Sequence, residues 1–156
     1  MAKPLTEGDK APAFMLETDG AGKLSLKDLA GKPAVLYFYP KDDTPGCTKE
    51  ALDFTAAANA FKKLGATVVG VSKDSVAAHD RFKKKHKLTV ILASDPEGKV
   101  VESYGAWVEK SMYGRTYMGI DRSTFLIDGK GRLAKIWRKV RVPGHVGEVL
   151  GAAEEL

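Results

Sequence analysis

An unbroken apolar run that leads through a proline-glycine turn into an amphipathic stretch most constrains how this chain can fold. Residues 34–39 have the character of a strand that is buried on both faces. We expect Pro45 and Gly46 to interrupt regular structure after it, which places Cys47 in or next to the first turn of a helix. The apolar face of that helix recurs every three or four residues, at Ala51, Phe54, Ala58, Phe61 and Leu64.

Periodicity and turn residues predict the remaining elements. A β-hairpin comes first, followed by strands that alternate with helices, then a second hairpin and a closing helix. Segment 106–118 lacks clean periodicity, and we expect it to be a loop packed against the body. The other spans are a hairpin of 14–17 and 24–26, a helical turn at 28–31, the end of the Cys47 helix at Gly65, a strand at 67–72, a helix from Asp74 or Ser75 to about His86, a strand at 90–94, a short helix opened by 95–97 and closed by Gly105, a hairpin of 123–128 and 132–140, and a helix at 144–155.

The order of these elements predicts an α/β fold. Strands joined by right-handed helical crossovers run parallel, so we expect parallel middle strands and an antiparallel edge from the second hairpin. The chain of 156 residues has room for one domain with a full core. The prediction is one domain over residues 1–156, with a mixed central sheet, helices on both faces and an N-terminal β-hairpin extension. Thioredoxin-like proteins share this architecture.

Composition and charge exclude several classes of function. The N-terminus has no apolar signal-peptide core and no segment approaches the roughly 20 apolar residues of a membrane span, which predicts a cytoplasmic protein without membrane contact. The single cysteine rules out an internal disulfide and suits a reducing compartment. The net charge is +5, but the one dense basic cluster, residues 83–87, lies on a predicted helix with Phe82 inward. We therefore expect a solvated helix face and no nucleic-acid binding.

No pattern for a metal or an organic cofactor accompanies the cysteine. Three histidines lack metal-ligand spacing with it, and we expect them at the surface or half buried: His79, His86 and His145. The sequence contains no C-x-x-C pair, P-loop or G-x-S-x-G elbow. Packing in the core or in the loop explains the aromatic residues of segment 106–118 more simply than a substrate pocket does. These are Trp107, Tyr113 and Tyr117.

Cys47 is the candidate nucleophile. A lone cysteine is often no more than a small buried hydrophobic residue. Residues 41–46 before it are polar or turn-forming, however, and loops fixed by a rigid sheet often carry function. In the first turn of a helix, unpaired backbone N–H groups and the helix dipole favour the thiolate. A fast catalyst also needs donors for the charge on the expelled group, and Thr44 and Arg122 are the candidate hydroxyl and guanidinium.

Two sequence blocks resemble a known family. Pro40-x-x-x-Thr44-x-x-Cys47 is similar to the active-site signature of peroxiredoxins, and the string 38–51 resembles their bacterioferritin comigratory protein branch. Block 119–128 is similar to a second block of that branch, and the likeness covers nearly the whole chain.

The resemblance implies a role for each matching position. Cys47 would be the peroxidatic nucleophile, and Pro40 would shield its pocket from water. Thr44 would hydrogen-bond the thiolate and the peroxide, while Arg122 would hold the thiolate and polarise the peroxide. Two further residues match and are expected at the rim of the pocket: Glu50 and Lys41. For Glu50, a solvated first-turn carboxylate favourable to the helix dipole is an equally good reading.

The resemblance implies a thiol-dependent peroxidase that reduces hydrogen peroxide and organic hydroperoxides through a Cys47 sulfenic acid. Many members of the branch carry a second cysteine five residues after the first, where this chain has Leu52. The expected partner is therefore an external thiol, namely thioredoxin, glutaredoxin or glutathione. The alternative is a one-thiol transferase acting on glutathione mixed disulfides. We expect a monomer.

Overall fold

The computed structural model describes residues 4–156 of the chain. This part contains nine strands, five α-helices and two 3-10 helices. The strands are β1 (Met15–Thr18), β2 (Gly22–Ser25), β3 (Ala34–Phe38), β4 (Thr67–Ser72), β5 (Ile91–Ser94), β6 (Trp107–Met112), β7 (Arg115–Ile120), β8 (Ser123–Ile127) and β9 (Leu133–Trp137). The helices are η1 (Asp19–Ala21), η2 (Leu26–Leu29), α1 (Pro45–Ala56), α2 (Ala58–Lys63), α3 (Val76–His86), α4 (Lys99–Ser103) and α5 (His145–Glu154).

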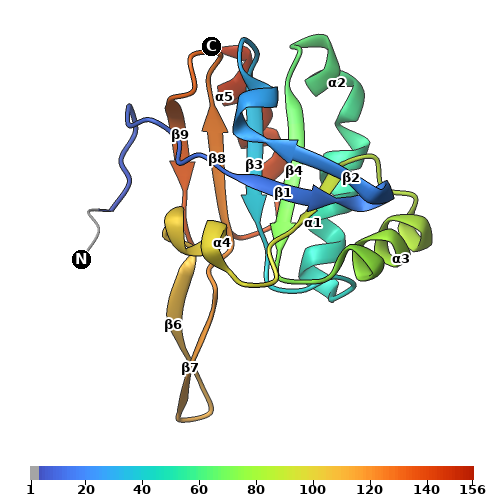
Figure 1. Cartoon of the computed structure of the whole chain (residues 1–156), viewed down its shortest axis with the longest axis vertical. Helices are drawn as coiled ribbons and strands as arrows, with labels where there is room; N and C mark the ends of the chain where they lie inside the picture. Colours follow the sequence, from blue (N-terminus) through green and yellow to red (C-terminus); the bar gives the residue numbers. More distant parts are fainter. Residues whose placement is uncertain (1–3) are drawn as a thin grey trace.

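A mixed seven-stranded sheet in the order β2-β1-β5-β4-β3-β8-β9 forms the centre of the molecule (Figure 1). β3 pairs in parallel with β4 and β4 with β5, whereas β8 runs antiparallel to β3. Leu36 in the middle of β3 lies opposite Val69 on one side and Phe125 on the other. Every residue of β3 is buried. The predicted strand, the parallel centre and the antiparallel edge are confirmed.

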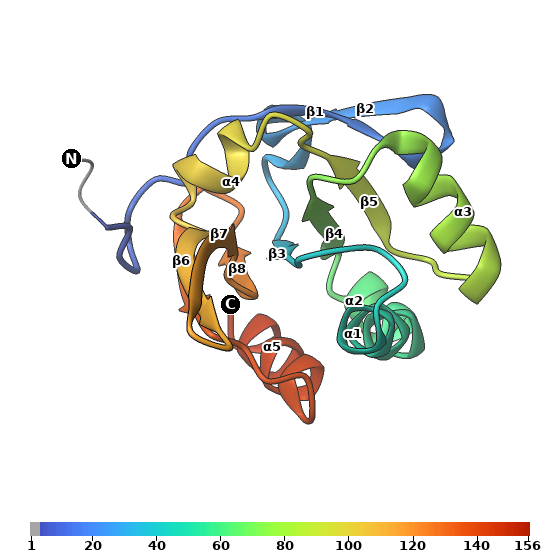
Figure 2. The same cartoon turned by 90° about the horizontal axis from the view of Figure 1, so that it is seen from below.

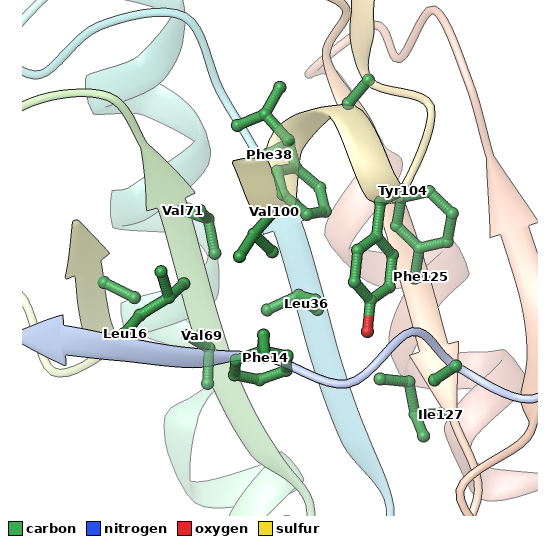
Figure 3. Packing of buried hydrophobic residues seen from close by; sticks show 14 of the residues in the cluster. Phe14, Leu16, Leu36, Phe38, Val69, Val71, Val100, Tyr104, Phe125 and Ile127 are labelled. Atoms are coloured by element: carbon green, nitrogen blue, oxygen red, sulfur yellow. The ribbon is translucent and has the colours of Figure 1, made fainter. Parts of the chain in front are cut away.

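Two apolar cores lie on opposite faces of the sheet because side chains alternate along β3. Val35, Tyr37 and Tyr39 pack with helices α1, α2, α3 and α5. Leu36 and Phe38 pack on the other face with Tyr104, which follows α4, and with the N-terminal segment (Figure 3). Seen from below, α1, α2 and α5 lie on one side of the sheet and α4 lies on the other (Figure 2). The Cys47 helix therefore packs on a face where long aromatic side chains fill the space beneath it.

The first hairpin is part of the main sheet. β1 and β2 pair antiparallel as predicted, with Leu16 opposite Leu24. β1 also pairs with β5, where Glu17 lies opposite Ser94. The predicted N-terminal hairpin is therefore confirmed, and the structure adds that it extends the main sheet, because β1 completes the hydrogen bonding of an edge that β5 would otherwise expose.

The Cys47 helix differs from the prediction at both ends. It begins at Pro45 rather than after Gly46, because proline is well tolerated at the first helical position, where its missing N–H is not needed. It is also interrupted at Ala57, whose φ of −93° and ψ of 6° are not helical, so that α1 ends before this residue and α2 begins after it. Gly65, with a φ of 71°, follows α2 as the predicted left-handed residue.

Segment 106–118 is a strand hairpin and not a packed loop. β6 and β7 pair antiparallel from Trp107 opposite Ile120 to Met112 opposite Arg115, forming a separate two-stranded sheet that projects from the body (Figure 1). Tyr113 at the turn is 97% exposed and Tyr117 is 45% exposed, so neither packs in a core. Trp107 is half buried beneath the Lys73 ammonium group, 4.3 Å from the ring centroid. Because Ile120 is the one buried residue of these two strands, the hairpin lacks the apolar alternation that would have predicted it.

Two short helical segments lie a few residues from their predicted places. The turn expected at 28–31 is η2, capped by Ser25, whose hydroxyl accepts from the amide of Asp28. The short helix expected from 95–97 begins at Lys99 instead, because Gly98 before it has a left-handed φ of 74°. Asp95 accepts from the amide of Val101 in its first turn at 2.8 Å. Within residues 4–156, no helix is both long and apolar enough to cross a membrane.

Candidate active site

Cys47 lies in the first turn of α1, as predicted. Thr44 is the N-cap and Pro45 the first helical residue, so the amides of Gly46 and Cys47 have no partner within the helix. The cysteine is 2% exposed and packs in the aromatic core beneath the helix. Burial alone would fit a structural cysteine, and the polar groups around the sulfur decide the matter.

Arg122 brings a guanidinium group to the sulfur. It directly precedes β8, the antiparallel neighbour of β3, and its Nη2 donates to Cys47 Sγ at 3.3 Å. Its Nη1 donates to Glu50 Oε1 at 2.7 Å. The close approach depends on Gly46, since a Cβ there would lie 3.1 Å from Nη2. The two arms of one guanidinium thus join the sulfur to a carboxylate one turn further along α1.

Glu50 lies inside the site. Its side chain is fully buried and its Oε2 has no hydrogen-bond partner among the described residues. Burial raises the pKa of Glu50 to about 7, although the charge of Arg122 and its hydrogen bond lower it. The solvated reading of this carboxylate is therefore wrong. Glu50 is a buried acid that changes charge near neutral pH.

Arg122 stays charged in this setting. Burial lowers its pKa, but the charges of Glu50 and Cys47 and the hydrogen bonds to both outweigh burial and raise the pKa above its usual value. Its side chain is 17% exposed, so the cation is largely shielded from water. A permanent cation in a partly buried site exerts a strong field on the sulfur and on charge that develops beside it.

The other predicted residues lie around this centre. The hydroxyl of Thr44 donates to the carbonyl of Lys41 at 2.8 Å, so its single proton would have to turn away from that carbonyl to reach the sulfur. Pro40 is exposed just after β3. Lys41 is exposed and lines a cavity of about 430 Å³ between the loop and α3. The predicted roles of Thr44 and Pro40 remain predictions.

Two histidines expected at or near the surface are buried. His79 on α3 is fully buried and its Nδ1 lies 2.7 Å from Asp42 Oδ2. His145 is 4% exposed and its Nε2 lies 2.8 Å from the hydroxyl of Thr124. Burial lowers the pKa of His145, which Glu148 raises and Arg122 lowers further. His86 matches the expectation better, with a side chain that is 23% exposed.

The contact between Asp42 and His79 is a feature of the site region that the sequence did not predict. One signal was available: His79 precedes Phe82 by three residues and so shares the inward face of α3. Nothing local indicated that this face meets the loop before Cys47.

The arrangement suits nucleophilic attack by sulfur. A thiolate at a helix N-terminus with a guanidinium beside it is held in an electropositive setting, and the same guanidinium can stabilise negative charge on an expelled oxygen.

Comparisons with known proteins point to the same chemistry. Residues 7–136 match the model of the AhpC/TSA family. The chain is 54% identical to a protein named putative peroxiredoxin bcp from Coxiella burnetii, over 92% of this chain and 95% of that protein. It is 49% identical to peroxiredoxin Bcp of Bacillus subtilis, over 96% and 95% of the two chains.

Solved structures give the same result. A cysteine-to-serine mutant of PrxQ from Xylella fastidiosa superposes with a TM-score of 0.93 and 39% identity, covering 99% of this chain and 98% of that one. The bacterioferritin comigratory protein of Xanthomonas campestris, solved to explain its alkyl peroxide reduction activity, has a TM-score of 0.87 and 43% identity, covering 91% and 90%. With these matches over nearly its full length, and with Cys47 held by Arg122 at the start of α1, the chain belongs to the AhpC/TSA family and is a peroxiredoxin, a thiol-dependent peroxidase.

Proposed function

We propose that this peroxiredoxin reduces hydrogen peroxide and organic hydroperoxides at Cys47 and is recycled by an external thiol. The observation that carries the proposal is the 3.3 Å contact between Arg122 Nη2 and Cys47 Sγ at the N-terminus of α1. The thiolate attacks the terminal oxygen of the hydroperoxide, a sulfur–oxygen bond forms and the oxygen–oxygen bond breaks. The expelled oxygen takes up a proton and leaves as water or an alcohol, and Cys47 becomes a sulfenic acid.

Arg122 acts on both partners of this step. It donates a hydrogen bond to the sulfur and offers positive charge to the oxygen–oxygen bond as it breaks, which favours the transition state over the bound peroxide. We assign Thr44 as the hydroxyl donor to the peroxide, after rotation away from the carbonyl of Lys41. Pro40 limits the access of water at the end of β3. Supporting these assignments, both residues flank the loop that ends at α1.

Thiols from outside the chain must complete the cycle, because the sequence has one cysteine. One thiol displaces water from the sulfenic acid and forms a mixed disulfide with Cys47. A second thiol releases Cys47 and leaves as a disulfide. Thioredoxin, glutaredoxin and glutathione are the candidate reductants. Leu52, at the position where many relatives in the branch have a second cysteine, is 39% exposed on the outer side of α1.

If an external thiol reduces the sulfenic acid, α1 does not have to unwind to bring two cysteines together. Two cysteines five residues apart on a helix are poorly placed to bond unless the helix unwinds. We therefore expect the amides of residues 47–55 to be as protected from hydrogen exchange in the oxidised protein as in the reduced one. Cooperative loss of their protection on oxidation would contradict this.

The decisive experiment compares peroxide consumption by the wild type and by Cys47→Ser in the presence of excess thiol. We expect the wild type to consume hydrogen peroxide under these conditions, while the serine variant remains folded and inactive. When thiol is left out, one equivalent of peroxide should leave one equivalent of sulfenic acid on Cys47. Turnover of a glutathione mixed disulfide without any consumption of peroxide would identify a thiol transferase instead.

We further propose that the enzyme works in the cytoplasm as a monomer. A chain with one buried cysteine and no disulfide suits a reducing compartment. Light scattering after gel filtration at micromolar concentration should give the mass of a single chain, 16.8 kDa. Twice that mass would refute the monomer.

A further inference from the structure

A buried ionic cluster lies beside the active site but does not touch the sulfur. His79 is fully buried on α3, with Nδ1 2.7 Å from Asp42 Oδ2 and Nε2 2.9 Å from the carbonyl of Ala93 on β5. The hydroxyl of Tyr39 donates to the other oxygen of Asp42 at 2.6 Å. The peroxidase reaction described above uses none of these groups.

Both ring nitrogens of His79 face acceptors. The carbonyl of Ala93 can only accept, so Nε2 must carry a proton. A carboxylate can only accept as well, so Nδ1 carries a second proton and His79 is an imidazolium. Burial lowers the pKa of His79, but the hydrogen bond and charge of Asp42, the carbonyl of Ala93 and the charge of Asp74 outweigh it and raise the pKa.

The partner carboxylate lies in the loop that leads to Cys47. Asp42 is five residues before the cysteine, and its own amide donates to Asp74 Oδ2 at 2.9 Å. The next residue, Asp43, has a φ of 59°, in the left-handed region that residues other than glycine rarely adopt. A loop with such a strained residue keeps its shape only when its surroundings hold it.

We propose that the buried His79–Asp42 ion pair is the positioning element of this peroxidase: it fixes the loop of residues 40–44 to α3 and β5, and thereby sets where α1 begins and where Cys47 meets Arg122. The proposal rests on the proposed function of Cys47. His79 acts through Asp42 and the loop, since its contacts are with Asp42, Tyr39 and Ala93.

The pair also makes the loop sensitive to alkaline pH. The groups that face the imidazole are Asp42 from the loop, Tyr39 from the end of β3, Asp74 from the turn before α3, and the carbonyl of Ala93 from β5. Because its pKa is raised in the folded protein, His79 contributes stability that is complete below its usual value of 6.5 and is lost as the pH rises through the raised pKa. Loss of the proton leaves a ring nitrogen lone pair against Asp42 or against Ala93.

The test compares the wild type with His79→Gln, using His86→Gln as the matched control. His86 is also on α3 and contacts the neighbouring Asp43, at 2.8 Å, but at the protein surface. Hydrogen exchange measured by mass spectrometry from pH 6 to pH 10 gives protection factors for the amides of residues 41–48. NMR of the imidazole signals gives the titration of His79 directly.

We expect the wild-type protection factors of residues 41–48 to fall about tenfold or more as His79 loses its proton, while those of β8 are unchanged. In His79→Gln they should be low at every pH and show no step, and the peroxide rate should fall by about tenfold. His86→Gln should retain the wild-type step. Equal loss of protection in the loop and in β8 would indicate general destabilisation and overturn the proposal, as would a wild-type loop with no alkaline step.

The same data separate this proposal from the proposed function. The wild-type exchange step and the His79 titration require no catalysis and no variant that folds poorly. If the wild type is inactive but its loop loses protection as His79 loses its proton, the peroxidase assignment is refuted and the role of the His79–Asp42 pair in holding the loop stands. Full peroxidase activity in His79→Gln, with low protection of the loop amides, would show that the His79–Asp42 pair holds the loop but does not position Cys47.

Discussion

Two buried ion pairs flank the loop and helix that carry Cys47, and they differ in what they touch. Arg122 meets Glu50 at 2.7 Å and reaches the sulfur with its other arm. His79 meets Asp42 at the same distance and reaches a backbone carbonyl. Burying a charge pair costs desolvation energy in both cases. A buried pair does not by itself mark a reaction centre, and only the Arg122–Glu50 pair also contacts Cys47 Sγ.

The two carboxylates are also satisfied to different degrees. Asp42 accepts from Tyr39 on one oxygen and from His79 on the other. Glu50 accepts from Arg122 on one oxygen, and its second oxygen has no partner in the part of the chain described. Unmet hydrogen bonding in a buried place favours the protonated acid. We infer that Asp42 has a structural role, whereas Glu50 can vary its charge around neutral pH.

Removal of the structural carboxylate should have the largest effect on stability. Asp42→Ala leaves His79 buried without a counter-charge, and such a change typically costs about 3–5 kcal/mol. Urea unfolding at pH 7 measures it. A loss below 1 kcal/mol, with the loop still ordered, would show that the imidazole simply releases its proton and that the pair contributes little.

Removal of the cation at the sulfur should have the largest effect on the chemistry. Arg122→Ala takes away the donor to the sulfur and to the expelled oxygen, so the second-order rate with peroxide should fall roughly 100- to 1,000-fold. Stopped-flow measurement at saturating thiol gives this rate. Arg122→Lys is the control, since it keeps the charge but cannot join the sulfur and Glu50 in the same planar geometry. A rate within threefold of the wild type in the alanine variant would refute the role of Arg122.

Neutralisation of Glu50 should change how stability depends on pH. Its pKa is raised from 4.5 to about 7, so the folded protein holds a proton that the unfolded chain has released. The free energy of unfolding of the wild type should therefore fall by on the order of 3 kcal/mol, from this group, as the pH rises from about 4.5 to about 7. Glu50→Gln removes that slope and keeps an oxygen for Arg122. Parallel stability curves for the two proteins across this range would contradict the raised pKa.

The surface pair beside the loop should matter least. Asp43 accepts from Lys85 at 2.7 Å and from His86 at 2.8 Å, with its side chain 41% exposed. These hydrogen bonds lower the pKa of Asp43, but water and salt screen an exposed pair. His86→Gln should leave the thermal midpoint and the peroxide rate within experimental error. A clear loss in either would mean that the outer contact, and not His79, holds the loop.

Local patterns determined much of this protein. The apolar run of β3, the turn at Pro45 and Gly46 and the helical spacing after them place Cys47 in the first turn of α1, because strand, turn and helix preferences depend on neighbouring residues. The alternation of strands and helices also predicted the mixed sheet. The β6–β7 hairpin was not predicted, because its largely exposed strands carry no apolar periodicity.

The contacts of the cysteine and its loop with side chains far away in the sequence depend on the fold. Arg122 lies 75 residues from Cys47, and His79 lies 37 residues from Asp42. β8 brings the first contact together because it pairs beside β3, and α3 brings the second because it packs over the loop at the end of that strand. Local propensity contains no information about such contacts, since they arise from the order of strands in the sheet and from the packing of helices on it. The sequence alone therefore places the single cysteine in the first turn of a helix, and the fold sets which charges surround it.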